Sequence, residues 1–260
     1  MDEKEQVDII LGTHNHIELT APCVVALYEY TEIPFRLTVV DDSTDGVTPI
    51  YFEKLQEKKG NIKYIRPRKK ITSTNMVINI GLKNTDSEFV VFLGNSTIVE
   101  PKWLNAAWGV IHQHQDIGII GFKEVYPQGH IEHAGIHFEP GMPHHTNFGV
   151  GEPAHRWTHI ADVPLVGGCL VLFRRLAVPV GGFDEDYYIG FRGYDDLDNC
   201  FQMHENGWRV VYCGLGTAIH RAQATQRADT ELEQYAREYD ENRFRFLARW
   251  GVPPLGKKDE

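Results

Sequence analysis

The chain has 260 residues, of which 42% are hydrophobic and 24% charged, a balance typical of a globular protein with a substantial core. The formal net charge of −10 argues against general nucleic-acid binding, and no apolar run approaches the roughly 18 residues that a membrane-spanning helix needs. The first residues lack the pattern of a secretory signal, and no two cysteines form a C-x-x-C pair. We therefore expect a cytoplasmic protein with reduced thiols and no transmembrane segment, with peripheral membrane contact as an alternative.

The first half of the sequence alternates β-branched runs with patterns of helical period. Strands are predicted at residues 7–11, 37–40, 62–65, 89–93 and 117–122, and helices at residues 20–30, 73–82 and 103–114. Thr20 is the expected cap of the first helix. The alternation predicts βαβ units and therefore an α/β fold, in which helices flank a Rossmann-like, mainly parallel sheet.

The second half opens with an irregular segment, residues 127–164, rich in Gly, Pro and His. Its histidines offer a conceivable zinc set, made of His130, His133, His137, His144 and His145. No H-E-x-x-H motif or cysteine pair accompanies them, so packing or solvated histidines are the better interpretation.

Regular structure is expected again after this segment. Strands are predicted at residues 165–173, 209–213 and 217–220, followed by an amphipathic helix at residues 230–250 that Gly251 and Pro253 end. Gly167 and Gly168 lie in the first of these strands, where glycine lets a backbone or a ligand approach closely.

Two groups of acidic residues are candidates for a functional site. Asp41 and Asp42 follow a predicted strand and therefore lie at the carboxyl end of a parallel sheet, where ligands bind in open α/β folds. A carboxylate there can accept a hydrogen bond from a nucleobase or a ribose hydroxyl, but the same residues are also common in solvated turns.

Asp195, Asp196 and Asp198 form the second group. Clustered carboxylates in an apolar setting raise one another's pKa, which would suit a general base. The alternative is a helix N-terminus, where acidic residues are favourable for electrostatic reasons alone. Lys69 and Lys70 belong to a local basic cluster that is either a solvated loop or a grip for an anionic ligand.

Ten motifs in order carry a family resemblance over nearly the whole chain. They include VDIILGTHN, VVDDSTDG, FVVFLGNSTIVEPKWL, GHIEHAGI, VGGCLVLFRR, VGGFDEDY and YDDLDNCF. In this order they resemble the family 2 glycosyltransferases of the GT-A fold. The resemblance implies an inverting hexosyltransferase of polysaccharide biosynthesis, which moves a sugar from a nucleoside-diphosphate donor, UDP preferred, to a hydroxyl of a glycan or lipid-linked acceptor.

The resemblance also implies roles for individual residues. Asp42 first and Asp41 second would hold the nucleoside. Asp196 would be the general base, with Asp195 holding the acceptor and Asp198 supporting the helix. Further nucleotide contacts would come from Gly12, Thr13 and Asn79. The donor sugar and pyrophosphate would meet Asn95, Ser96, Gly167, Gly168 and Lys70.

The expected metal ligand is missing from this pattern. The aspartate that relatives use to bridge a metal to the pyrophosphate falls on Ser96, with Asn95 beside it, and an expected arginine is Ile78. His220 matches a histidine that some relatives use on the same metal. Either Mn or Mg is weakly held through His220, or Lys69 and Lys70 replace it, or activity is lost.

The resemblance implies a single domain, 1–260, with a nucleotide-binding half (1–104), a donor-sugar and acceptor half (105–228), and a C-terminal helix and tail (229–260). A catalytically inactive GT-A domain that binds nucleotide sugars or glycans is the main alternative. A Rossmann-type methyltransferase or dehydrogenase would need a glycine-rich turn after the first strand, and the sequence LGTHNH lacks it.

Overall fold

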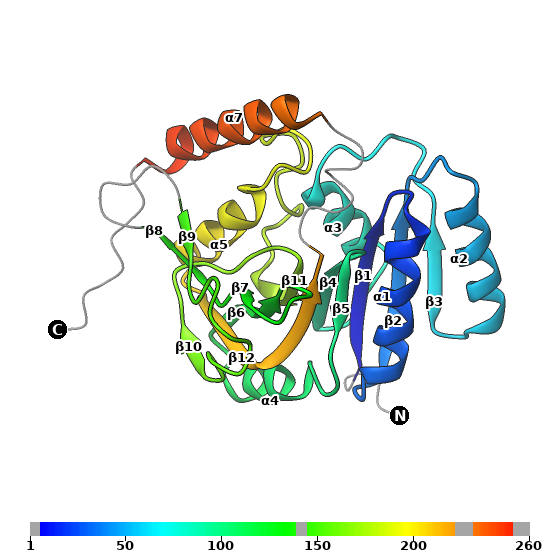
Figure 1. Ribbon diagram of the computed structural model, residues 1–260, viewed down its shortest axis with the longest axis horizontal. Coiled ribbons are helices and arrows are strands. Elements are labelled where there is room, and N and C mark those ends of the chain that lie inside the picture. The colour runs from blue at the N-terminus through cyan, green and yellow to red at the C-terminus, as the bar shows by residue number, and fades with distance from the viewer. Residues whose placement is uncertain (1–5, 139–144, 222–230, 252–260) are drawn as a thin grey trace.

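The computed structural model describes residues 6–138, 145–221 and 231–251 (Figure 1). Its first half alternates strands and helices, as predicted: β1 (Val7–Thr13), α1 (Ile17–Tyr30), β2 (Phe35–Asp41), α2 (Val47–Lys58), β3 (Ile62–Ile65), α3 (Thr74–Leu82) and β4 (Phe89–Gly94). Only α2 was not predicted. Few of its side chains are buried, chiefly Thr48, Pro49 and Phe52, so its apolar pattern is weak.

The second half is richer in short strands. It comprises β5 (Thr97–Val99), α4 (Asn105–Gln113), β6 (Ile117–Val125), β7 (Ile131–His133), β8 (Ile136–Phe138), β9 (His145–Asn147), β10 (Ile160–Asp162), β11 (Leu170–Arg174), the 3-10 helix η2 (Arg175–Ala177), α5 (Asp195–Glu205), β12 (Arg209–His220) and α7 (Leu232–Trp250). The segment predicted to be irregular therefore contains four short strands, β7 to β10.

A ten-stranded sheet forms the centre of the described part of the chain, in the order β10-β12-β6-β11-β4-β1-β2-β3, with β5 and β7 pairing β12 and β6. The strands β3, β2, β1 and β4 are parallel, as are β6 and β12. β11 runs antiparallel between β4 and β6 and so joins the two parallel groups. The predicted α/β fold is confirmed, with a mixed, mainly parallel sheet.

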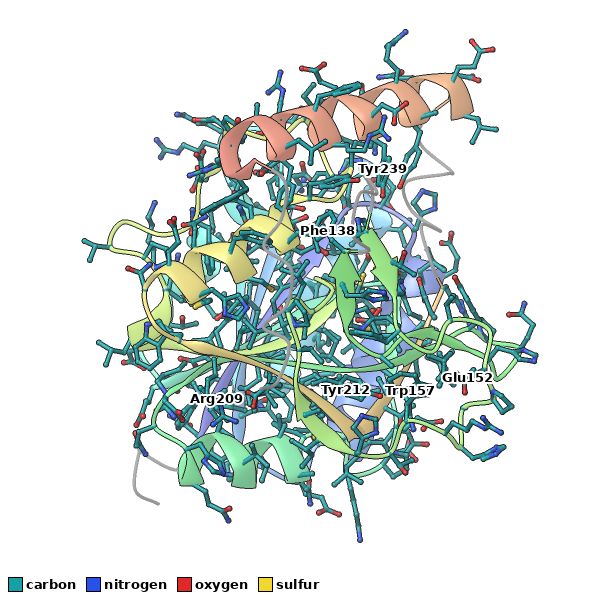
Figure 2. All side chains as sticks on the ribbon, turned by 90° about the vertical axis from the view of Figure 1, so that its left-hand side faces the viewer. Phe138, Glu152, Trp157, Arg209, Tyr212 and Tyr239 are labelled. Atoms are coloured by element: carbon teal, nitrogen blue, oxygen red, sulfur yellow. The ribbon has the colours of Figure 1, made fainter. Side chains whose placement is uncertain are left out.

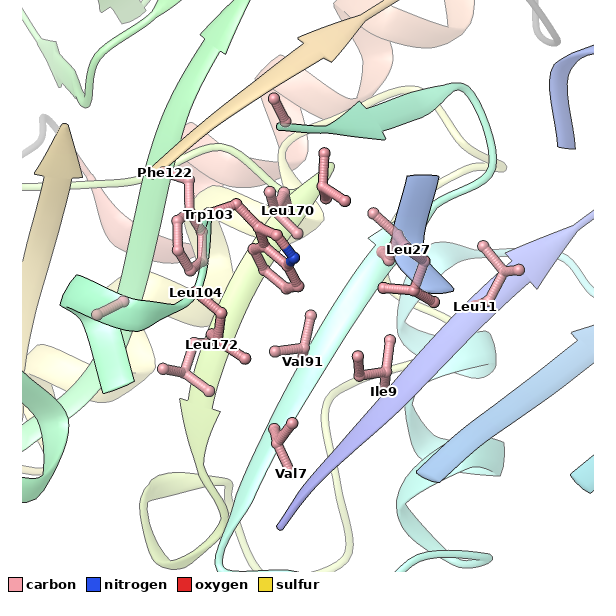
Figure 3. Close-up of a cluster of buried hydrophobic side chains, with 14 of the residues drawn as sticks. Val7, Ile9, Leu11, Leu27, Val91, Trp103, Leu104, Phe122, Leu170 and Leu172 are labelled. Atoms are coloured by element: carbon pink, nitrogen blue, oxygen red, sulfur yellow. The ribbon is translucent and has the colours of Figure 1, made fainter. Parts of the chain in front are cut away.

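Helices cover both faces of this sheet because successive strand residues point to opposite sides. Val7, Ile9 and Leu11 of β1 pack in one cluster with residues of α1 and α4. Figure 3 shows this cluster, in which Trp103 lies among the side chains of several strands. Ile10 points to the other face, where α3, α5 and α7 contribute to a second cluster.

The C-terminal helix α7 lies across the second layer, above α5 (Figure 1). Phe246 is fully buried and stacks on Phe138 with the ring centroids 5.6 Å apart. Figure 2 shows Phe138 on the small β8–β9 hairpin beneath α7, near Tyr239 of that helix. Trp250 Nε1 donates to Asp198 Oδ1 at 2.6 Å, so α7 and α5 are joined by a polar contact as well as by packing.

Several predicted element boundaries are wrong. α1 begins at Ile17 with His16 at its N-cap, so Thr20 lies inside the first turn and does not cap the helix. β11 begins at Leu170, which leaves Gly167 and Gly168 in the loop before it. The two late strands form one strand, β12, with a register shift between Cys213 and Thr217.

The C-terminal helix begins at Leu232, two residues later than predicted, while Thr230 and Pro253 lie outside the described residues. Among the helices that the structure describes, none is both long and apolar enough to cross a membrane.

The packing of α7 can be tested with two phenylalanines of the same helix. Phe246→Ala should lower the free energy of unfolding by about 3–5 kcal/mol, because it leaves a cavity between α7 and the sheet layer. Phe244 is 60% exposed, so Phe244→Ala should change the stability by no more than about 0.5 kcal/mol. Urea unfolding followed by circular dichroism measures both. Equal losses would show that α7 does not pack as described.

Candidate active site

Asp41 and Asp42 lie at the carboxyl end of β2, beside the end of β1, as predicted. Asp41 is fully buried, and both of its carboxylate oxygens accept hydrogen bonds, from the Ser43 N–H at 2.8 Å and the Tyr64 hydroxyl at 2.5 Å. Asp41 therefore closes the turn after β2 and has little capacity left for a ligand.

Asp42 is the more accessible of the two, with 14% of its side chain exposed. One carboxylate oxygen lies 2.7 Å from His14 Nδ1, and the other accepts the Ile71 N–H at 3.2 Å. Asp42 thus joins the end of β1 to the loop after β3. Lys70, the neighbour of Ile71, is exposed and lines a pocket of ≈ 520 Å³ that Arg192 and Arg245 also line.

A chain of hydrogen bonds connects β1 to the turn after β4. Thr13 Oγ1 lies 3.1 Å from Thr20 Oγ1, which accepts from Asn95 Nδ2 at 3.0 Å. The position of Thr20 inside α1, rather than at its cap, is what allows this contact. Gly12 serves packing at the same point, because a Cβ there would lie 2.9 Å from Val77 Cγ1 of α3.

Asn79 of α3 holds the loop that precedes α5. Its Nδ2 donates to Phe183 O at 2.7 Å and to Glu185 Oε1 at 2.8 Å, while its Oδ1 accepts the Phe183 N–H at 2.9 Å. The side-chain amide is thus occupied by protein groups, and its contact with a nucleotide stays a prediction. Ile78, next to it, is buried in the core of this face.

Asp195 and Asp196 form the first turn of helix α5. The helix N-terminus that was one interpretation of these residues is therefore present, and it does not exclude a general base there. Asp195 is buried, whereas Asp196 is half-buried. Asp196 Oδ2 accepts the Gly168 N–H at 3.0 Å, so the loop before β11 and the acidic pair are in contact. A Cβ on Gly168 would lie 2.8 Å from Asp196 Cβ, and only glycine permits this approach.

Burial controls the protonation of this pair. The pKa of Asp195 is raised to about 7, mainly by burial and in addition by the negative charge of the neighbouring Asp196. Burial also raises the pKa of Asp196, although the N–H groups of Leu197 and Gly168 oppose the effect. Asp195 Oδ2 has no hydrogen-bond partner among the described residues. Both carboxylates line a cavity of ≈ 10 Å³, which has room for about one water.

Asp198 has a structural role. It is fully buried and accepts hydrogen bonds from the Tyr188 hydroxyl, Gln202 Nε2 and Trp250 Nε1. These contacts fix the first turn of α5 against α7 and the preceding loop, which holds the acidic pair in place. They agree with the prediction that Asp198 supports the helix.

The turn that contains Asn95 and Ser96 lies beside His220, as the resemblance implies. β5 pairs with the end of β12, so Thr97 is opposite His220, and Ser96 O accepts the Arg221 N–H at 3.1 Å. Gly94 N–H donates to Cys169 O at 2.8 Å, which ties the turn to the loop that holds Asp196.

Three residues that the sequence analysis did not single out surround His220. Its Nδ1 lies 3.0 Å from Glu132 Oε2 and 3.6 Å from Glu124 Oε2, and ligand atoms of Glu124, Cys169 and His220 all lie within 4.8 Å of one another. The sequence held a signal for Glu124, because this charged residue continues the apolar run of β6, all of whose residues are buried. A buried carboxylate normally has a partner or a metal ion.

The charges of this group are strongly coupled. Burial raises the pKa of Glu124 to about 7, with further raising contributions from Glu132 and Asp196 against a lowering one from His220. Burial alone would lower the pKa of His220, but Cys169, Glu132 and Glu124 together raise it well above its usual value. Cys169 directly follows Gly168, whose N–H binds Asp196, so this group lies next to the acidic pair.

The alternative zinc set of histidines is not assembled among the described residues. The buried His133 accepts the Gly167 N–H on Nε2 at 2.8 Å and directs Nδ1 to Phe122 O at 3.4 Å. Burial lowers the pKa of His133 to about 4, so its ring is neutral. His137 stacks on Phe148, with the ring centroids 4.2 Å apart. Packing is thus the role of His133 and His137, whereas His130 is exposed and His144 lies outside the described residues.

The mixed, mainly parallel sheet with helices on both faces is the architecture of the GT-A fold. Residues 8–174 match the family model "Glycosyl transferase family 2", and the chain therefore belongs to this family.

Curated relatives and solved structures agree with this assignment. The chain is 26% identical over 244 residues to the O-antigen biosynthesis protein RfbC of Myxococcus xanthus, covering 86% of this chain but 18% of that protein. It is 26% identical over 130 residues to the hyaluronan synthase of Pasteurella multocida, covering 48% of this chain and 13% of the synthase. The chain thus spans less than a fifth of the length of these two relatives.

Among solved structures, GalNAc-T7 with UDP, GalNAc and Mn²⁺ is similar with a TM-score of 0.70 and 14% identity, over 95% of this chain and 51% of that one. S. aureus TarS 1-349 in complex with UDP-GlcNAc is similar with a TM-score of 0.60 and 18% identity, over 94% of this chain and 73% of that one. These similarities confirm the GT-A fold.

The raised pKa of Asp195 predicts a pH-dependent stability. Its pKa is about 7 in the folded protein and near the ordinary value of 3.8 in the unfolded chain, so the folded state binds more protons between these values. The free energy of unfolding should therefore fall as the pH rises from about 4 to about 7. Asp195→Asn should remove the part of this fall that Asp195 contributes.

Thermal melting of the wild type and of Asp195→Asn at a series of pH values tests the effect. The melting temperature of the variant, relative to the wild type, should be higher at about pH 8 than at about pH 4. Asp186→Asn is the matched control, because Asp186 is exposed and should show little pH-dependent difference. A constant difference for Asp195→Asn would contradict the raised pKa.

Proposed function

We propose that the protein is an inverting glycosyltransferase that moves a sugar from a UDP-sugar to a hydroxyl of a glycan or lipid-linked acceptor, with Asp196 as general base. The observation that carries the proposal is the half-buried Asp196, held by the Gly168 N–H next to a buried partner, Asp195. A carboxylate with a raised pKa that remains partly accessible suits proton abstraction near neutral pH.

The proposal that the donor is a UDP-sugar is supported by the position of Asp42 and by the ligands of similar proteins. Asp42 lies at the carboxyl ends of β1 and β2, the usual ligand edge of such sheets. The GalNAc-T7 structure contains UDP, and TarS was solved with UDP-GlcNAc. We assign Asp42 to the nucleoside, with Thr13 and Gly12 beside it. Asp41, whose oxygens are both occupied, supports the turn.

The proposed chemistry is a single displacement. Asp196 takes the proton of the acceptor hydroxyl while that oxygen attacks the anomeric carbon, and the bond from this carbon to the β-phosphate oxygen of UDP breaks. The attack from the side opposite the leaving group inverts the configuration. Asp195, whose pKa is raised to about 7, would in its protonated form donate a hydrogen bond to the acceptor and leave Asp196 as the base.

The leaving diphosphate carries negative charge that the site must stabilise. A divalent cation would supply this stabilisation when bound. Asn95 and Ser96 offer no carboxylate for it, and Lys70 is exposed at the edge of the nucleotide region, where it can contribute a positive charge. Gly167 and Gly168 would allow the donor sugar to approach the backbone before β11.

The base assignment predicts a specific kinetic defect. Asp196→Asn should lower kcat for acceptor-dependent transfer by about 10²–10⁴-fold, because an amide cannot take the proton. Affinity for UDP, measured by titration calorimetry, should stay nearly unchanged, because the base acts on the acceptor. Asp186→Asn provides the control on an exposed carboxylate. Full turnover by Asp196→Asn would place the base elsewhere.

The assignment of Asp42 to the nucleoside predicts a loss of UDP affinity, in contrast to the loss of turnover expected for Asp196→Asn. Asp42→Ala should weaken UDP binding by about tenfold or more, the loss expected for a charge-assisted hydrogen bond. Glu53→Ala removes an exposed carboxylate from the neighbouring helix α2 and should leave binding unchanged. Calorimetry with UDP measures both variants. Unchanged affinity in Asp42→Ala would remove Asp42 from the nucleoside site.

Because Asn95 and Ser96 offer no carboxylate for a metal, a second function is considered, that of an inactive GT-A domain that binds nucleotide sugars or glycans without transfer. UDP binding without acceptor-dependent transfer would favour this second function. Transfer that Asp196→Asn abolishes would exclude it.

A further inference from the structure

The group around His220 has the composition of a metal site. Glu124, Cys169 and His220 each direct one ligand atom into a common region, with all of these atoms within 4.8 Å of one another. They come from β6, the loop before β11 and the end of β12, so three separate segments converge there. Zinc bonds of about 2.0–2.3 Å hold tetrahedral ligands roughly 3.3–3.8 Å apart, which small side-chain rotations would reach.

An unpartnered oxygen independently points to a missing ligand. Glu124 is 4% exposed, and its Oε1 has no hydrogen-bond partner within the described ranges. A buried carboxylate oxygen without a partner is costly, and such groups are normally paired or coordinate a metal. Glu124 Oε2 and Glu132 Oε2 lie 3.6 Å and 3.0 Å from the same imidazole nitrogen, His220 Nδ1, so two carboxylates share one ring.

Glu132 supplies an arrangement that is characteristic of metal-bound histidines. Its Oε2 lies 3.0 Å from His220 Nδ1, where it can accept a hydrogen bond, and Nε2 would lose its proton to become the ligand atom when a cation binds. Metal-ligating histidines almost always donate their other ring N–H to such a carboxylate or carbonyl.

We propose that Glu124, Cys169 and His220 bind a zinc-class divalent cation, with Glu132 orienting His220 and the fourth position open to water or a phosphate oxygen. The thiolate selects zinc or cobalt over manganese and magnesium, because soft sulfur ligands favour the former. Cys169 loses its thiol proton to solvent when the cation binds. Three protein ligands with one open position is the pattern of a catalytic rather than a structural zinc site.

The location gives the cation a role, and this role alone rests on the proposed function. Cys169 directly follows Gly168, which holds Asp196, and its carbonyl binds the turn that contains Asn95 and Ser96. A cation there lies between the acidic pair and the turn that lacks a carboxylate. It would stabilise the leaving diphosphate from neighbouring strands in place of the aspartate missing at Ser96.

Cobalt spectroscopy on the full chain, stripped of metal and free of nucleotide, tests the site directly. Cobalt(II) should bind with a stoichiometry of one ion per chain. Binding should produce a thiolate-to-cobalt charge-transfer band, which added zinc removes. Cys169→Ala should abolish the band, whereas Cys213→Ala, which removes a buried thiol from β12 outside the cluster, should retain it. Manganese should compete poorly.

The remaining ligands have their own variants. Glu124→Gln and His220→Ala should each weaken cobalt binding by more than tenfold, and Glu132→Gln by about 10–100-fold. Circular dichroism checks that each variant is folded, and Cys169→Ser replaces Cys169→Ala if the alanine variant does not fold. The proposal is overturned by absent cobalt binding, by binding without the charge-transfer band, or by a band that persists without Cys169.

The same experiment separates this proposal from the proposed function. UDP calorimetry in the presence of a chelator reports on the nucleotide site without the cation. A cobalt site without UDP binding would leave the metal ligands established and the transferase assignment wrong. UDP binding and sugar transfer without cobalt binding would overturn the metal site and leave the transferase assignment supported.

Discussion

The antiparallel strand β11 is the constraint on which the site depends. It pairs with β4 on one side and β6 on the other, so it fixes the two parallel groups of the sheet in one register. Its far end is anchored by the buried Arg174, whose guanidinium donates to carbonyl oxygens of Ile117, Ile111 and His114. The loop before β11 is therefore held from both sides, and this loop carries Gly168 and Cys169.

Burial gives the two aspartates of α5 different properties, although they are adjacent in the sequence. The more buried Asp195 holds its proton to a pH near 7, while Asp196 is half-buried and accepts two backbone N–H groups. Keeping such a pair inside the fold costs free energy, which the packing of α5 against α7 and the sheet layer offsets. A site of this kind depends on rigid surroundings, because a small opening would admit water and return both pKa values to normal.

The sequence predicted most of what local patterns determine. β3 was placed to the residue, and the acidic pair could be singled out as a candidate, at the start of a helix, because its motif is local. The roles of Thr20 and Asn79 could not be predicted, because their partners lie far away in the chain and depend on how helices pack. The cluster of Glu124, Cys169 and His220 shares this origin, since strand order rather than sequence proximity brings the three together.

The pairing of β12 with β6 explains how a ligand can be supplied from another strand. Glu124 lies opposite Ala218 in this parallel pair, and Val125 lies opposite Ile219, so a carboxylate on β6 reaches the residue that ends β12. The β4–β5 turn approaches the same point from the other side through the pairing of Thr97 with His220. Either segment can therefore place a side chain beside His220. This arrangement does not depend on a carboxylate at Ser96, because the position next to this histidine is determined by strand pairing rather than by the turn.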